Sequence, residues 1–210
     1  MLDKIYIINL DKRTDRWKHI EQNVIPLIPK KHSDKVVRIS AVDHTNYPMR
    51  EQRAAGCSYS HTGIWKHAIE NNYSNILIIE DDLKWWVETN ILEEYFDFFE
   101  TIDYNVIQIA YRNESELLKS KYEKLVHCHK FITTTSYFAN VNFLKTMLPE
   151  IEFAASQLLL GKPTRTYAID IFWRKWQTDE KWFGTSEKLG WQIDGFSNIE
   201  IQNFIFNENN

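Results

Sequence analysis

Three adjacent carboxylates follow directly after an uninterrupted apolar segment. Residues 76–79 read Ile-Leu-Ile-Ile, and Glu80, Asp81 and Asp82 come next. Carboxylates this close repel one another, which is costly in a partly closed cleft unless a cation or hydrogen-bond donors offset the repulsion. A hard divalent ion, Mn²⁺ or Mg²⁺, offsets it and can also bind the oxygens of a diphosphate. Taken alone, the triplet is more typical of an acidic loop start in water.

Two further polar groups favour a binding site. Asn9, Arg13 and Arg16 follow an apolar run, so that guanidinium groups can approach a phosphate while the strand end holds a base or ribose. The alternative for this group is an exposed helix face. Ser60 and His61 close the segment Gly-Cys-Ser-Tyr-Ser-His, which we expect at a helix start and in a pocket wall, with simple helix capping as the alternative. We expect His61 to form hydrogen bonds there rather than to bind a metal.

The apolar spacing predicts the elements that must position these residues. β-branched and aromatic runs predict strands at residues 4–10, 35–41, 75–79, 104–110 and 131–139. Apolar residues three and four apart predict helices at residues 11–24, from 58 or 60 to about 71, 91–100 and 142–150. Residues 43–53 predict a loop, and residues 170–176 an aromatic helix or turn. The alternation indicates an α/β fold, in which ligands bind at the carboxyl ends of strands.

Length and composition restrict the class of protein. A chain of 210 residues suits one domain, which we place at residues 1–206 with a frayed tail at 207–210. With 25 basic against 29 acidic residues, nucleic acid is excluded as a main partner. Two cysteines form no disulfide framework. Because residues 1–10 lack the apolar core of a signal peptide and no apolar stretch is long enough to span a bilayer, we expect a cytoplasmic protein that is soluble, or peripheral through a partner. Nothing in the sequence specifies an oligomeric state.

Taken together, the motifs resemble glycosyltransferase family 25, which contains lipooligosaccharide and collagen galactosyltransferases. The sequence Tyr-Ile-Ile-Asn-Leu-Asp at residues 6–11, with Arg13, Asp15 and Arg16, looks like the opening strand of that family. The Gly-Cys-Ser-Tyr-Ser-His segment with Trp65 looks like its central helix, and Glu80-Asp81-Asp82 like its metal-binding triplet. Weaker similarities follow at Thr134-Thr135-Ser136-Tyr137, Asp170, Gln192, Ser197 and Ile199.

This resemblance implies a single GT-A-type, Rossmann-like domain with a mixed central sheet flanked by helices. It also implies a UDP-sugar donor, Mn²⁺ or Mg²⁺, and inverting transfer of a hexosyl or N-acetylhexosaminyl group to a hydroxyl of a glycan or glycoconjugate, as in lipopolysaccharide biosynthesis. Asn9, Arg13, Arg16, Ser60, His61 and Glu80 would then bind the donor. Asp82 would be the direct metal ligand and Glu80 the second, because alternate residues of an extended segment share one face. Asp81 is expected to turn away or to bond to backbone.

Transfer also requires a base that takes the proton of the attacking hydroxyl. We predict Asp170, since it lies in an aromatic, apolar stretch where burial would raise its pKa and where sugars could stack. Asp194 and Glu187 are alternatives, and Asp170 could instead cap the following helix.

Two other functions stay compatible with the sequence. A nucleotidyltransferase would also place acidic residues and a divalent ion at a strand end, although this chain has no glycine before Gly56 for a glycine-rich phosphate loop. A catalytically inactive module could bind a nucleotide-sugar or glycan through its aromatic residues without turnover.

Overall fold

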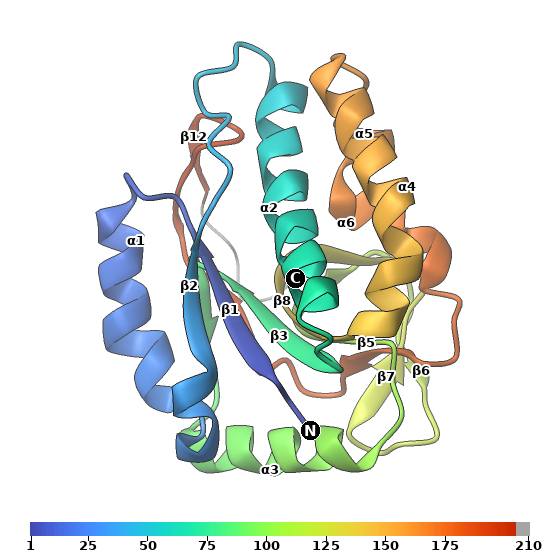
Figure 1. Ribbon diagram of the computed structural model, residues 1–210. Helices are drawn as coiled ribbons and strands as arrows, with labels where there is room; N and C mark the ends of the chain where they lie inside the picture. The colour runs from blue at the N-terminus through green and yellow to red at the C-terminus, as the bar shows by residue number, and fades with distance from the viewer. Residues whose placement is uncertain (205–210) are drawn as a thin grey trace.

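A mixed eight-stranded sheet forms the centre of the computed structural model, which describes residues 1–204 (Figure 1). The strand order in this sheet is β2-β1-β3-β8-β5-β9-β7-β6. Along the chain its strands are β1 Lys4–Asn9, β2 Val36–Ser40, β3 Asn75–Glu80, β5 Val106–Asn113, β6 Leu118–Lys119, β7 Leu125–His127, β8 Phe131–Asn140 and β9 Trp182–Thr185. Two small antiparallel sheets pair β4 Leu83–Trp85 with β10 Gly190–Gln192 and β11 Gly195–Ser197 with β12 Gln202–Phe204. The α/β fold class is thereby confirmed. The tail predicted to fray lies outside the described residues.

Strand pairing brings the polar residues together at one end of the strands, where β1, β3 and β5 terminate. β1 and β3 run parallel, with Ile8 beside Glu80, so their carboxyl ends are adjacent. β8 runs antiparallel to β3, which places Ser136 and the start of β8 beside Ile79. β5 is antiparallel to β8 and therefore ends at the same edge with Arg112. As expected for an open α/β sheet, the polar groups collect where these strands end.

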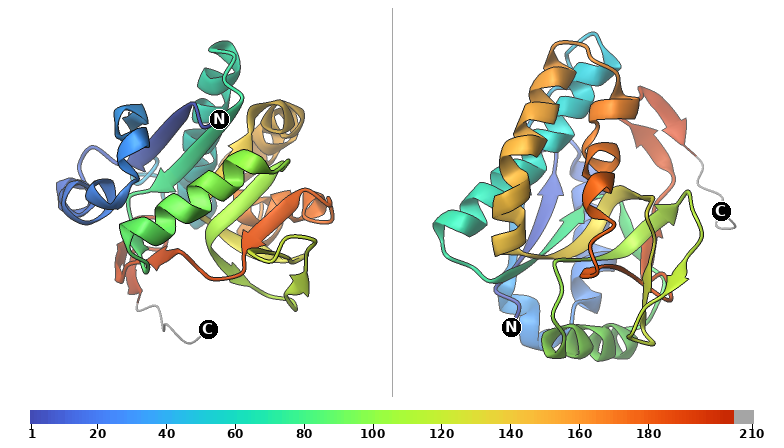
Figure 2. Two further views of the ribbon diagram at one scale, coloured as in Figure 1. Left: turned by 90° about the horizontal axis from the view of Figure 1, so that it is seen from below. Right: turned by 90° about the vertical axis from the view of Figure 1, so that its right-hand side faces the viewer.

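Helices cover both faces. α2 Arg50–Glu70 and α4 Val141–Leu159 lie side by side on one face, which Figure 1 shows in front of the sheet. The other face carries α1 Thr14–His19, η1 Ile20–Val24 and α3 Thr89–Thr101, with α3 crossing the lower end of the sheet (Figure 2). Short segments complete the chain: η2 Ile25–Leu27, η3 Lys30–Lys35, α5 Thr164–Tyr167, α6 Ile169–Phe172 and η4 Trp173–Trp176. No helix within residues 1–204 has both the length and the apolarity to cross a membrane.

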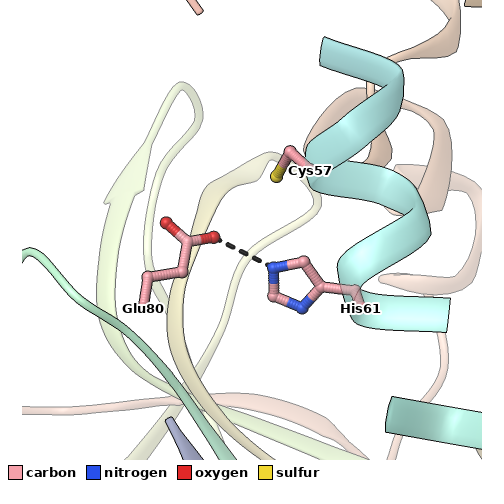
Figure 3. Close-up of side chains that lie close together, drawn as sticks. All are labelled: Cys57, His61 and Glu80. Atoms are coloured by element: carbon pink, nitrogen blue, oxygen red, sulfur yellow. Dashed lines mark hydrogen bonds and ion pairs between the residues drawn. The ribbon is translucent and has the colours of Figure 1, made fainter. Parts of the chain in front are cut away.

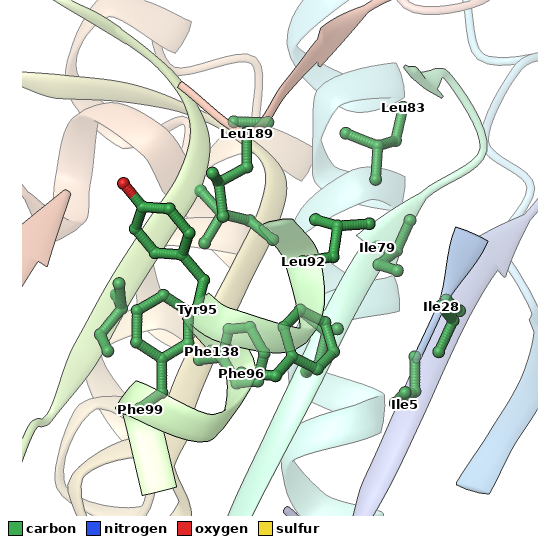
Figure 4. Close-up of a cluster of buried hydrophobic side chains, with 14 of the residues drawn as sticks. Ile5, Ile28, Ile79, Leu83, Leu92, Tyr95, Phe96, Phe99, Phe138 and Leu189 are labelled. Atoms are coloured by element: carbon green, nitrogen blue, oxygen red, sulfur yellow. The ribbon is translucent and has the colours of Figure 1, made fainter. Parts of the chain in front are cut away.

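The alternation of side chains along β3 builds two cores. Ile76 and Ile78 pack under α2 and α4, whereas Leu77 and Ile79 join the core beneath α3. All four are fully buried, and burying such a side chain contributes roughly 1.5–3 kcal/mol. Beneath α3 the rings of Phe96 and Phe99 lie edge-on to Phe138, with centroids 4.9 and 5.0 Å away (Figure 4). β3 is thus held on both sides up to Glu80.

α2 begins earlier than the sequence predicted. It starts at Arg50, so most of the expected loop at 43–53 precedes the helix and its last residues belong to it. Residues 50–55, Arg-Glu-Gln-Arg-Ala-Ala, are good helix formers, and this local preference outweighs the nearby Pro48. The side chains of Ser58 and Ser60 do not cap the helix; they donate to the carbonyls of Ala54 and Gly56, four residues earlier. α4 is also longer than expected and continues past Pro149.

Gly56 is required where the segment after β2 crosses α2. A Cβ at this position would lie 2.7 Å from the carbonyl oxygen of Val42 and 3.0 Å from Cβ of His44. Gly63, on the same helix, has no atom within 4 Å of the corresponding point.

We therefore expect Gly56→Ala to destabilise the fold by about 1–3 kcal/mol, because backbone must shift to admit the methyl group. Gly63→Ala is the matched control and should stabilise by about 0.5–1 kcal/mol, since alanine is the better helix former. Urea unfolding of both variants measures the difference. Equal effects in the two variants would contradict the close approach.

Candidate active site

A cavity of about 360 Å³, here called the main cavity, opens at the edge where the strands end. Its lining is rich in charged side chains: Arg13, Arg16, Arg50, Glu80, Asp81, Asp82, Arg112, Asp170 and Glu200. A side cavity of about 110 Å³ lies against it and shares Leu10, Cys57, Glu80, Asp81, Asn198 and Ile199. The predicted acidic strand end therefore faces a cleft and not open solvent.

Arg16 partly neutralises two of the three carboxylates. Its Nη1 donates to Oδ1 of Asp81 at 2.8 Å and to Oδ2 of Asp82 at 3.2 Å. Asn9 adds a hydrogen bond of 2.7 Å to the other oxygen of Asp81. Burial is the largest single influence on the pKa of Arg16 and acts to lower it. The surrounding carboxylates together outweigh burial and raise this pKa, so the guanidinium stays charged. Arg16, which follows the first strand, thus contacts the acidic triplet directly.

Asp82 keeps one oxygen without a partner. Its Oδ1 is buried and forms no hydrogen bond within the described part of the chain. Burial, together with the charges of Glu80 and Asp81, raises the pKa of Asp82 to about 7 despite the nearby Arg16. An unpartnered buried carboxylate oxygen of this kind is suited to a cation.

The expected division of the triplet between two faces is wrong. The strand ends at Glu80, and Asp81 and Asp82 form a turn, so the alternation of an extended segment does not continue. Asp81 and Asp82 consequently share Arg16, whereas Glu80 points towards α2. Asp81 does not turn away: it lines both cavities.

A buried chain of hydrogen bonds fixes Glu80. Trp65 Nε1 donates to the hydroxyl oxygen of Tyr137 at 3.0 Å, and that hydroxyl lies 2.9 Å from Nδ1 of His61. His61 Nε2 lies 3.0 Å from Oε1 of Glu80, which also accepts a hydrogen bond from Thr134 (Figure 3). The directions agree if Tyr137 donates to Nδ1 and the Nε2–H of His61 donates to Glu80. Although burial acts to raise it, these bonds and Arg16 lower the pKa of Glu80.

The other residues predicted to bind the donor have different positions. Asn9 is buried and lines neither cavity. Its amide nitrogen donates to Asp81 and to the carbonyl of Arg13, and its amide oxygen accepts from Arg38. Arg13 lines the main cavity and is held by Asp15 and by Asn198, at 2.7 Å from Nη1. Ser60 lines the side cavity from the interior of α2, not from a helix start with free N–H groups, and its oxygen accepts from the N–H of Val42.

Asp170 reaches the main cavity from the first turn of α6. It is half-buried, and burial together with the charge of Glu80 raises its pKa, against a hydrogen bond from the backbone N–H of Thr133 at 3.3 Å. Ala168, not Asp170, is the cap of α6. Asp194 and Glu187, the alternative bases, are exposed and do not line the cavity.

Thr133 adopts a backbone conformation that threonine rarely takes. Its φ is 76°, in the left-handed region, and it lies where the pairing of β8 with β5 is irregular. Such strain in a β-branched residue is typical of functional sites, and bulges often lie beside them. Here the strained residue presents its N–H to Asp170. Nothing in the sequence signals this conformation.

Arg50 and Arg112 were not singled out from the sequence; they bring guanidinium groups to the main cavity from α2 and β5. Cys57, part of the Gly-Cys-Ser-Tyr-Ser-His segment, lies at the boundary of the two cavities. Arg50 pairs with Glu200. Within residues 1–204 the side chain of Arg112 has no ion pair or hydrogen bond, although its backbone belongs to β5. The weakly matching Gln192, Ser197 and Ile199 do line the main cavity.

Comparison with known proteins gives one family and a set of solved structures. The family described as glycosyltransferase family 25 (LPS biosynthesis protein) matches residues 2–158. A search of curated proteins gives no match. The crystal structure of a glycosyltransferase involved in the glycosylation of the major capsid of PBCV-1 is similar, with a TM-score of 0.55 and 12% identity, covering 95% of this chain and 96% of that one. Its likeness supports a GT-A-like fold.

A second solved structure is more distant. Mouse xyloside xylosyltransferase 1, in its apo form, has a TM-score of 0.47 and 8% identity over 87% of this chain and 84% of that one.

The pKa of Asp82 leads to a prediction about stability. Because the folded chain holds this proton up to about pH 7 whereas the unfolded chain releases it near pH 4, ionisation of Asp82 reduces stability as pH rises between these values. In EDTA, Asp82→Asn should therefore melt a few degrees above the unsubstituted protein at pH 8. The difference should shrink towards pH 4. A constant difference across this range in thermal melts would contradict the raised pKa.

The chain through Tyr137 leads to a second prediction. Tyr137→Phe should cost about 1–3 kcal/mol, because the indole N–H of Trp65 and Nδ1 of His61 lose a buried partner. Combining it with Trp65→Phe should cost less than the sum of the single changes, as measured by a double-mutant cycle in urea. Additive costs would show that the two groups are not coupled.

Proposed function

Because this chain belongs to glycosyltransferase family 25, we propose that it transfers a sugar from a UDP-sugar to a hydroxyl group of a glycan or glycoconjugate. One observation carries the proposal. The main cavity joins the acidic end of β3, suited to a nucleotide diphosphate with its ion, to a separate half-buried carboxylate, Asp170, suited to a base. Inverting transfer uses a base on the face of the reacting carbon opposite the departing diphosphate.

The donor would bind at the end of β1 and β3. Arg13 and Arg16 line this part of the cavity, and each is already oriented by fixed partners, Arg13 by Asn198 and Arg16 by Asp81 and Asp82. Guanidinium groups held in this way can contact phosphate oxygens with little further loss of side-chain freedom. The side cavity, with Ser60 and His61 in its wall, offers room for the base or ribose.

The acidic residues fit a hard divalent ion. The buried, unpartnered Oδ1 of Asp82 makes this residue the best supported ligand, and Asp81, which lines the same cavity, is better placed than Glu80 to assist it. Mn²⁺ or Mg²⁺ held there would neutralise charge on the departing diphosphate. Arg16 offsets part of the negative charge of these two carboxylates.

Asp170 would act as the base. As the acceptor oxygen bonds to the anomeric carbon, its proton passes to Asp170 and the bond from that carbon to the diphosphate oxygen breaks. Attack on the face opposite the leaving group inverts the configuration at the anomeric carbon. The raised pKa of Asp170 makes its carboxylate a better proton acceptor near neutral pH, and Thr133 holds it in place.

The family description also supports a biological setting. It names lipopolysaccharide biosynthesis, so we place the acceptor among glycans of that kind and the transferred group among hexosyl or N-acetylhexosaminyl groups. The reaction would take place in the cytoplasm, where sugar nucleotides are made.

Substitution of Asp170 tests the assignment of the base. Asp170→Asn should lower the release of UDP at saturating donor by about 10²–10⁴-fold, because the proton of the acceptor has no base to receive it. Donor binding, measured as a thermal shift, should stay near that of the unsubstituted protein. Asp194→Asn, at an exposed position outside the cavity, is the control. Turnover of Asp170→Asn near the unsubstituted level would show that another group acts as base.

A further inference from the structure

Three side chains of different chemistry converge between α2 and the end of β3. Cys57 and His61 are four residues apart on α2 and therefore project from one face of the helix. Glu80 approaches them from the sheet (Figure 3). A thiol sulfur, an imidazole nitrogen and a carboxylate oxygen of these residues all lie within 4.8 Å of one another.

We propose that Cys57, His61 and Glu80 form a binding site for Zn²⁺ or a similar thiolate-preferring divalent transition ion, separate from the position of the hard ion at Asp82. The site needs no sugar nucleotide, so it does not depend on the proposed transfer reaction.

The chemistry of the three groups selects the ion. Sulfur and imidazole ligands favour Zn²⁺ and related ions, whereas Mg²⁺ prefers oxygen ligands alone. Three protein ligands leave a fourth tetrahedral position open. Cys57 and Glu80 line both cavities, so the fourth position would be accessible from the cleft and an ion can enter there.

Supporting side chains already hold two of the ligands. Thr134 donates to Glu80, and the hydroxyl of Tyr137 lies 2.9 Å from Nδ1 of His61. Hydrogen bonds of this kind orient metal ligands and are part of most such sites. His61 and Tyr137 are fully buried, which limits the freedom of the imidazole to turn away.

Binding would rearrange two protons. The ion takes Nε2 of His61, and the imidazole proton is then carried on Nδ1. The hydroxyl of Tyr137 turns its own hydrogen away from Nδ1, and its oxygen accepts hydrogen bonds from Nδ1–H and from Trp65 through its two lone pairs. The thiol of Cys57 gives its proton to solvent as the sulfur bonds to the ion. The thiolate and the carboxylate of Glu80 then balance the two positive charges of the ion.

Titration with Co²⁺ tests the site. Protein freed of metal with EDTA should bind one equivalent of Co²⁺ with a near-ultraviolet absorption band from charge transfer between thiolate and metal. Zn²⁺ should abolish the band by displacement, and millimolar Mg²⁺ should not. Cys57→Ser should lose the band. Cys128→Ser is the matched control, since this other cysteine is buried beside Ser115 and outside the cluster, and it should keep the band.

A second variant guards against misfolding of the first. His61→Gln should weaken Co²⁺ binding by more than about tenfold, because losing a direct ligand should cost at least as much as losing a supporting residue. Far-ultraviolet circular dichroism checks that each variant is folded. Absence of a thiolate band at one equivalent, its persistence in Cys57→Ser, or its displacement by Mg²⁺ would each overturn the proposal.

Discussion

The carboxylates after β3 determine much of the surrounding structure, because three negative charges cannot lie together in a cleft without compensation. Arg16 supplies a positive charge to Asp81 and Asp82, and the chain ending at His61 directs donors to Glu80. The two arrangements separate the triplet into a pair facing α1 and a single group facing α2. Among these three carboxylates, Asp82 alone retains a buried oxygen without a partner within residues 1–204. Compensation is therefore incomplete at Asp82, the residue that we propose as a ligand of the hard ion.

Much of the fold could be predicted from local pattern. The strands containing Ile7 and Ile78 are apolar on both faces because helices cover both, and uninterrupted apolar runs are the signal of such strands. The position of the triplet directly after one of these runs placed it at the carboxyl end of a strand, and the motifs around it, not the triplet alone, indicated a cleft there. Its contact with Arg16 was not predicted, because the sequence suggested a phosphate as the partner of this guanidinium and does not show that β1 pairs with β3.

The remaining features depend on contacts distant in sequence. The start of α2 was missed because Pro48 and the polar residues after it resemble a loop. Residues 50–55 are nevertheless good helix formers and belong to the helix. The turn at Asp81 breaks the alternation from which its direction was predicted. Thr133 takes its left-handed conformation from an irregular pairing with β5, and the cluster around Cys57 exists only once α2 packs beside β3. The spacing of apolar residues along the sequence does not predict contacts between residues so far apart.

Nucleotide release from sugar nucleotides tests the central claim most directly. The unsubstituted protein is incubated with Mn²⁺ and, separately, with UDP-, GDP- and CMP-sugars, and both the released nucleotide and the thermal shift are followed. The proposed activity predicts release of UDP from a UDP-sugar together with a thermal shift. Release of pyrophosphate would indicate a nucleotidyltransferase instead, and stabilisation without release would indicate a binding module. No response to any sugar nucleotide would contradict the claim that this cleft binds a donor.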